Sequence, residues 1–159
     1  MAVNPVPPGH GTVTPSITVA GAAKAIDWYK KALGAEEISR FEGPGGRIMH
    51  AEIKIGDAYL MMGDEMPEYG ARGPGLLGGT PVSFFIYGPD VDARWKRAVD
   101  AGGKVTMPLA DQFWGDRSGS IEDPFGHQWW ISQRIKEMTK EELRKAGDEF
   151  MAQAGSAPA

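Results

Sequence analysis

The chain has 159 residues, of which 42% are hydrophobic and 24% are charged, a composition typical of a globular domain. Its net charge of −4 argues against a nucleic-acid or anionic-membrane partner, because both need a concentrated basic surface. The lack of cysteine excludes disulfides, thiolate metal ligands and a cysteine nucleophile. The N-terminus has no apolar core typical of a secretory signal, and the strongest apolar run, residues 82–87, is too short to cross a bilayer. We therefore expect a cytoplasmic protein.

The first half of the chain predicts the order β-α-β-β-β after a flexible tail at residues 1–11. Residues 12–19 alternate polar and apolar side chains, as a strand does, and residues 22–33 place apolar side chains at helical spacing before Gly34. Three further strands are predicted at residues 36–41, 47–55 and 58–62. Alternation in the middle one places Ile48, His50 and Glu52 on one face.

Residues 63–79 interrupt this order, because six glycines and two prolines predict a linker or a long functional loop. The order then resumes with strands predicted at residues 81–87, 104–113, 117–121 and 127–135, and a helix at residues 90–101. Asp90 is the predicted N-cap of that helix. Thr139 and Glu142 have the spacing of a capping box at the start of an amphipathic helix over residues 139–151.

The two halves also share sequence, which indicates a tandem duplication. Three pairs of similar segments lie 66 residues apart: Thr14-Pro15 with Thr80-Pro81, the segment 29–33 with 95–99, and Ile55-Gly56-Asp57 with Ile121-Glu122-Asp123. The predicted fold is therefore α+β, with two tandem βαβββ modules that form cupped mixed sheets. The modules span residues 12–62 and 80–135, and residues 136–159 form a C-terminal helix and tail.

Several motifs carry a resemblance to a known family. They are Ala25-Ile26-Asp27-Trp28-Tyr29, Leu33-Gly34-Ala35-Glu36, His50-Ala51-Glu52, Asp90-Val91-Asp92-Ala93, Phe113-Trp114-Gly115-Asp116-Arg117 and Asp123-Pro124-Phe125-Gly126-His127. Together they resemble the glyoxalase/bleomycin-resistance/dioxygenase group, the vicinal oxygen chelate superfamily, and most closely its PhnB-like branch. The resemblance implies two cup-shaped sheets that enclose a pocket, with modules paired within one chain or across a homodimer, in some members by swapping.

The resemblance also implies where a metal would bind. In metal-dependent members, the first and last strands of each module supply ligands to a divalent ion that acts as a Lewis acid. The matching positions here are Thr14, Met61, Ser83 and Trp130, with Thr80 in place of Ser83 if the repeat offset is followed. Hydroxyls are weak ligands, a thioether suits soft copper, and an indole does not coordinate metals. We expect no cofactor at these positions, while a divalent metal at a rearranged site remains open.

His50 and Glu52 are the candidate catalytic residues. His50 is a pocket base or a relocated metal ligand, with an ordinary pKa of about 6.5, or else a hydrogen-bonded residue on a half-buried sheet. His127 follows a glycine turn, which favours a histidine that fixes a loop.

Phe113, Trp114, Trp130 and Arg117 are the candidate ligand-binding residues. The aromatic side chains are suited to stack on a planar or apolar ligand, or else they pack in the core or at an interface. The guanidinium of Arg117 is suited to clamp an anionic or carbonyl group, or else to form an internal ion pair.

Three functions follow from these candidates, and whether the chain is an enzyme stays open. The first is metal-independent binding of a small planar or apolar molecule in the cup between the modules. The second is a lyase, isomerase or dioxygenase with a rearranged metal site that uses His50. The third is a non-catalytic structural homodimer. The fold alone does not choose among them, because one scaffold supports many chemistries.

Overall fold

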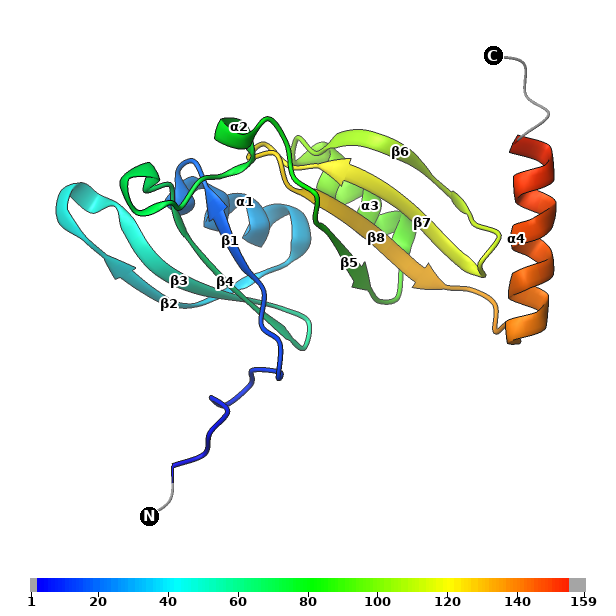
Figure 1. Cartoon of the computed structure of the whole chain (residues 1–159), viewed down its shortest axis with the longest axis horizontal. Helices are drawn as coiled ribbons and strands as arrows, with labels where there is room; N and C mark the ends of the chain where they lie inside the picture. The colour runs from blue at the N-terminus through cyan, green and yellow to red at the C-terminus, as the bar shows by residue number, and fades with distance from the viewer. Residues whose placement is uncertain (1–2, 155–159) are drawn as a thin grey trace.

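Two mixed sheets of four strands each, with the order β1-β4-β3-β2 and β5-β8-β7-β6, make up the computed structural model, which describes residues 3–154 (Figure 1). The first module contains β1 (Ser16–Val19), α1 (Ala22–Leu33), β2 (Glu36–Glu42), β3 (Ile48–Ile55) and β4 (Ala58–Asp64). The second contains β5 (Ser83–Tyr87), α3 (Val91–Asp100), β6 (Lys104–Asp111), β7 (Asp116–Glu122) and β8 (Gln128–Arg134). The predicted fold, two tandem βαβββ modules followed by a C-terminal helix, is confirmed.

The segments outside the two sheets are short turns and one long helix. Between the modules lie a 3₁₀ turn (Pro67–Tyr69) and the single-turn helix α2 (Pro74–Leu77). The C-terminal helix α4 (Lys140–Ala154) follows the predicted capping box, in which the Thr139 amide donates to Glu142 Oε2 (2.8 Å) and the Glu142 amide donates to Thr139 Oγ1 (3.2 Å). None of the helices in the described part of the chain has an apolar stretch long enough to span a membrane. The predicted tails at residues 1–2 and 155–159 lie outside the described residues.

Three local predictions are wrong, and each has a physical reason. The first strand begins at Ser16 rather than at residue 12, because Pro15 has no amide to donate to the sheet. In β3, the register shifts between the pairs Phe41–His50 and Glu42–Ile48, so Ile48 turns into the core while His50 stays on the opposite face. Asp90 does not cap α3 with its side chain.

The start of each long module helix is held by a side chain from the last strand of its own sheet. Asp64 Oδ1 accepts the amides of Gly21 (3.0 Å) and Ala22 (2.7 Å), and Gln133 Oε1 accepts the amide of Val91 (3.1 Å). The helices start at positions 22 and 91, and their capping side chains lie at positions 64 and 133, so structural equivalents are 69 residues apart. The duplication is therefore present, but the predicted offset of 66 residues is wrong for these elements.

The two modules meet through their helices and through one buried carboxylate. Helices α1 and α3 lie behind the sheets in Figure 1 and pack against each other. Asp123, 3% exposed, accepts hydrogen bonds from Tyr29 Oη of α1 and Trp129 Nε1 of β8, both at 2.7 Å. Its other oxygen accepts the amides of Phe125 (2.8 Å) and His127 (2.9 Å). Burial and the Asp123 carboxylate raise the pKa of Tyr29 above its ordinary value, which keeps the hydroxyl a donor.

Two further hydrogen bonds cross the same junction. Trp28 Nε1 donates to the carbonyl of Ala101 (2.8 Å), and Arg97 Nε donates to the carbonyl of Ala32 (3.1 Å). Both join the end of one helix to the other module, so the helices fix the relative position of the sheets.

We predict that Tyr29→Phe lowers the free energy of unfolding by about 1.5–3 kcal/mol, because it removes a buried hydrogen bond to a charged acceptor. The matched control is Tyr69→Phe, since Tyr69 is 80% exposed, and its expected change is below about 0.5 kcal/mol. Urea unfolding measures both. Equal values for the two variants would show that Asp123 does not hold the modules together.

A second comparison tests the two helix caps. Asp64 carries a charge at a helix N-terminus and also accepts the Ile48 amide with Oδ2 (2.7 Å), whereas Gln133 is a neutral acceptor of one bond. We expect Asp64→Ala to cost about 2–3 kcal/mol and Gln133→Ala about 1 kcal/mol in the free energy of unfolding. The same urea titration measures both losses, and a larger loss for Gln133→Ala contradicts this account.

Candidate functional site

A groove of about 530 Å³ lies between the two modules. One wall is the β3–β4 turn of the first module, and the other is the edge strand β5 with the turn that follows it. Its lining is mainly apolar and aromatic, and the residues that the argument uses are Tyr59, Phe84, Phe85, Tyr87, Arg94 and Trp129. Ligand pockets in proteins are commonly concave, apolar and of this size.

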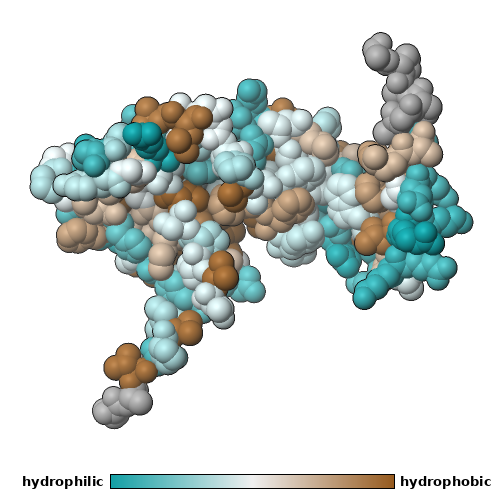
Figure 2. All heavy atoms as spheres, viewed as in Figure 1, coloured by the Kyte–Doolittle hydropathy of each residue, from teal (hydrophilic) through white to brown (hydrophobic). Residues whose placement is uncertain are grey.

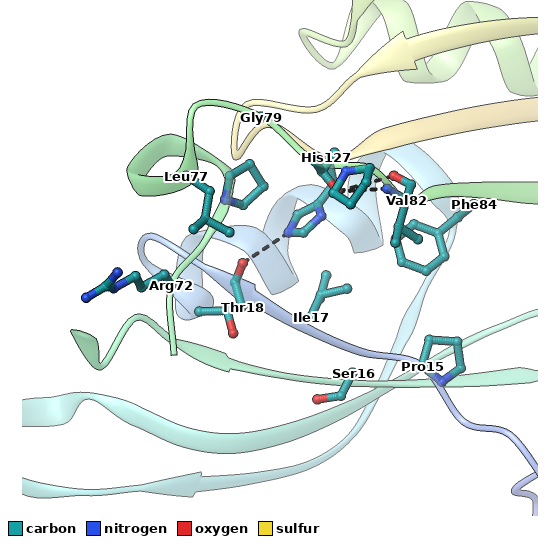
Figure 3. A pocket seen from close by; sticks show the side chains of 13 residues that line it. Pro15, Ser16, Ile17, Thr18, Arg72, Leu77, Gly79, Val82, Phe84 and His127 are labelled. Atoms are coloured by element: carbon teal, nitrogen blue, oxygen red, sulfur yellow. Dashed lines mark hydrogen bonds between the residues drawn. The ribbon is translucent and has the colours of Figure 1, made fainter. Parts of the chain in front are cut away.

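A second cavity of about 380 Å³ continues the junction toward α2 (Figure 3). Pro15 and Phe84 line both cavities, so the two lie along one seam between β1 and β5. His127 crosses this seam, with its Nε2 3.0 Å from the carbonyl of Thr18. Arg72 extends away from His127 in Figure 3 and is exposed to solvent.

An aromatic cluster covers the face of the second sheet opposite α3. Phe85 and Trp130 stack with ring centroids 5.0 Å apart and planes 5° apart, and Tyr87 stacks on Phe85 at 6.3 Å. Trp114 meets the edge of Trp130 at 6.4 Å. Because Phe85 and Tyr87 also line the groove, the cluster continues the groove wall onto the sheet face.

The buried carboxylate of Asp116 fixes part of this cluster. Asp116 is 1% exposed, and its Oδ2 accepts hydrogen bonds from Tyr87 Oη (2.9 Å) and Trp114 Nε1 (3.1 Å). Arg134 Nε donates to Oδ1 (3.2 Å) and balances the charge. Burial, and then the bond to Asp116, raises the pKa of Tyr87, so its hydroxyl stays protonated near neutral pH.

The structure brings three of the four predicted ligand-binding residues together and holds the fourth apart. Phe113 contacts Trp114 edge-on at 5.1 Å and stacks on Phe150 of α4 at 4.9 Å. Helix α4 therefore extends the cluster at its far end, and its outer surface is mainly hydrophilic (Figure 2). Trp130 lies nearer the groove, on β8.

Arg117 is the residue that lies apart. Its Nε and Nη2 donate to the Asp92 carboxylate at 3.0 and 2.7 Å, and its Nη1 donates to Asp111 at 3.0 Å. These bonds raise the pKa of Arg117. The arrangement corresponds to the internal ion pair rather than to a clamp open to a ligand.

The candidate catalytic residues lie on the open face of the first sheet. His50 Nε2 is 3.4 Å from Glu52 Oε1, and His10 Nε2 approaches the same oxygen at 3.5 Å. The side chain of His10 is 7% exposed and its ring packs on Tyr59 at 4.8 Å, a contact for which the sequence carries no signal. Within residues 3–154, no group of three or more His, Cys, Asp or Glu side chains is arranged to hold a metal ion.

The four positions that match the family's metal ligands do not fit a divalent cation. The Trp130 indole stacks on Phe85, and the Thr14 hydroxyl lies 3.4 Å from the Gly11 carbonyl, to which it donates. Met61 offers a thioether and Ser83 a neutral hydroxyl. Together they supply no carboxylate and no imidazole, the donors that hard and borderline divalent ions prefer.

The sequence did not identify the groove itself. Tyr59 and Arg94 are 35 residues apart in the chain, and only the packing of the two modules places them on one cavity. The segment from Phe84 to Tyr87 carried one usable signal: aromatic side chains on both faces of a strand, which a strand with one solvated face does not require.

Comparison with known proteins agrees with this fold. The family model described as Glyoxalase/Bleomycin resistance protein/Dioxygenase superfamily matches residues 10–131. An uncharacterized protein of Mycobacterium bovis is 41% identical over 149 residues, which cover 92% of this chain and 95% of that protein. Protein YjdN of Escherichia coli is 26% identical over 141 residues, covering 76% of this chain and 93% of YjdN.

Solved structures show the same architecture. TioX from Micromonospora sp. ML1 has a TM-score of 0.62 and 26% identity, covering 81% of this chain and 100% of TioX. The PhnB protein of Bacillus cereus has a TM-score of 0.55 and 17% identity, covering 77% of this chain and 99% of that one, and shows the fold alone. The chain belongs to the glyoxalase/bleomycin resistance protein/dioxygenase superfamily.

Proposed function

We propose that this protein binds a small planar or apolar molecule in the groove between its modules, without the metal that other members of the family use. The observation that carries the proposal is the groove of about 530 Å³ with aromatic side chains on both walls. Tyr59 lies on the first module, and Phe84, Phe85 and Tyr87 lie on the second. A flat ligand between such walls replaces water on two apolar surfaces at once.

The aromatic wall is held in place by the protein before any ligand arrives. Asp116 accepts the Tyr87 hydroxyl and the Trp114 indole, and Trp130 supports Phe85 from behind by stacking. Side chains that are already ordered lose little conformational entropy when they bind. This supports a binding site rather than a pocket that forms only by rearrangement.

The volume of the groove also bears on the structural alternative. A purely structural dimer would have its pocket filled by its own side chains, whereas this groove is large enough for a small organic molecule. The matched metal positions lack suitable donors, which supports binding without a metal. The family includes bleomycin resistance proteins, whose name refers to resistance to a small molecule, and this proposal assigns no reaction to the chain.

The first test is titration with N-phenyl-1-naphthylamine, a neutral, apolar, planar fluorescent probe. We expect saturable binding at one site, and we expect Phe85→Ala to weaken it roughly tenfold, because the variant removes one aromatic wall. The control is Phe41→Ala, since Phe41 is 63% exposed on β2 and does not line the groove. If both variants bind as the parent protein does, the groove is not the binding site.

The second test concerns metal. Excess EDTA, or added Mn, Co, Ni or Zn, is expected to change the probe's dissociation constant by less than roughly twofold, and His50→Ala is expected to bind like the parent protein. Mass spectrometry of the purified protein measures its metal content in parallel. Binding that EDTA abolishes and a metal restores, together with loss of that metal in His50→Ala, would replace this proposal with a rearranged metal site.

A further inference from the structure

One arginine in the groove has a charge that no carboxylate balances. Arg94 lies on α3, is half-buried and lines the groove. Its Nη1 donates to the carbonyl of Ser132 (3.4 Å) and its Nη2 to that of Ile86 (3.3 Å). Both bonds are long and go to neutral acceptors, while a guanidinium has five N–H donors. The remaining donors have no hydrogen bond to any of the residues that the structure describes.

Most other arginines of the described chain have carboxylate partners. Ion pairs join Arg40 to Glu37, Arg47 to Glu68, Arg117 to Asp92 and Asp111, Arg134 to Asp116, and Arg144 to Asp148. Arg72 and Arg97 also lack a carboxylate partner between residues 3 and 154, but both are exposed, so water solvates their charges. Arg94 is the half-buried one of these three.

The surroundings of Arg94 leave its charge unfavourably placed. Burial lowers the pKa of Arg94, and the neighbouring Arg97 lowers it further. Asp57 is the carboxylate that lines the groove, but it is exposed at the β3–β4 turn and forms no ion pair with Arg94. The titratable tyrosines of the lining are Tyr59 and Tyr87, and Tyr87 is committed to Asp116.

A glycine leaves the guanidinium uncovered on one side. Gly88 also lines the groove, and a Cβ at this position would lie 2.9 Å from Nη1 of Arg94. A side chain there would press on the charged group. The protein thus has an apolar, aromatic groove with one accessible, partly desolvated cation.

We infer that the ligand of this groove is a planar or apolar molecule with an anionic group, a carboxylate in the simplest case, and that Arg94 binds this group. The inference rests on the proposed function, since it assigns a ligand class to the same groove. A carboxylate on Arg94 supplies the charge-assisted hydrogen bonds that the protein itself does not, and the aromatic walls hold the apolar part of the ligand.

The experiment compares 2-naphthoate with 2-naphthamide, which have the same ring system and differ in charge. Isothermal titration calorimetry at low salt is expected to give the naphthoate a dissociation constant roughly tenfold lower than that of the naphthamide. Added salt is expected to reduce this ratio, because it screens the charge pair. In Arg94→Gln we expect the ratio to fall to about one, with naphthamide binding unchanged.

Two further variants control for folding and for general charge. Arg97→Gln removes the neighbouring positive charge, which does not line the groove, and is expected to keep the preference for naphthoate. Arg94→Lys keeps the charge but loses the planar fork, so we expect an intermediate ratio. If Arg94→Gln fails to fold, Arg94→Lys and the salt dependence still decide the question.

The outcomes separate the inference from the proposal beneath it. Equal binding of naphthoate and naphthamide by the parent protein overturns the anion preference and leaves the apolar groove in place. A preference that survives in Arg94→Gln overturns the role of Arg94. Binding of neither compound overturns both the anion preference and the proposed function of the groove.

Discussion

The buried carboxylate of Asp123 is the contact on which the groove depends. It lies in the β7–β8 turn of the second module and accepts the hydroxyl of Tyr29 from the first, so a single side chain joins both sheets to α1. A buried charge costs several kcal/mol unless hydrogen bonds satisfy it, and here four donors do so. Because the groove walls belong to different modules, its width follows from this junction and from the helix contact beside it.

A second buried carboxylate, Asp116, has the same chemistry in a different role. Each of the two accepts a tyrosine hydroxyl and an indole N–H. The donors to Asp123 belong to the core, so that carboxylate stabilises the fold. The donors to Asp116 are Tyr87 and Trp114, which face the sheet surface next to the groove, so that carboxylate positions the candidate site. In the Asp116-Arg117 motif, neighbouring residues on one strand point to opposite faces, which explains why Asp116 serves the aromatic cluster while Arg117 pairs with Asp92 and Asp111.

The sequence predicts the modules well because their signals are local. Alternation, helical spacing, glycine turns and the Thr139–Glu142 box each depend on residues a few positions apart. The errors come from contacts that span the chain. The amide of Val91 pairs with Gln133 rather than with Asp90, and the register shift in β3 depends on its pairing with β2. Arg94 was missed for the same reason: its lack of a carboxylate partner emerges only when the positions of all the acidic groups are known.

The groove also relates to the positions at which the family resemblance implies metal ligands. At Trp130, where that resemblance implies a carboxylate, an indole stacks on Phe85 and supports the groove wall. One side chain thus removes a metal donor and adds aromatic surface. A Lewis acid and an arginine both stabilise negative charge on ligand oxygens, but an arginine does so without coordination chemistry and suits binding more directly than turnover. With Arg94 on one wall and stacked rings on the other, the geometry favours holding an anionic aromatic molecule over transforming it.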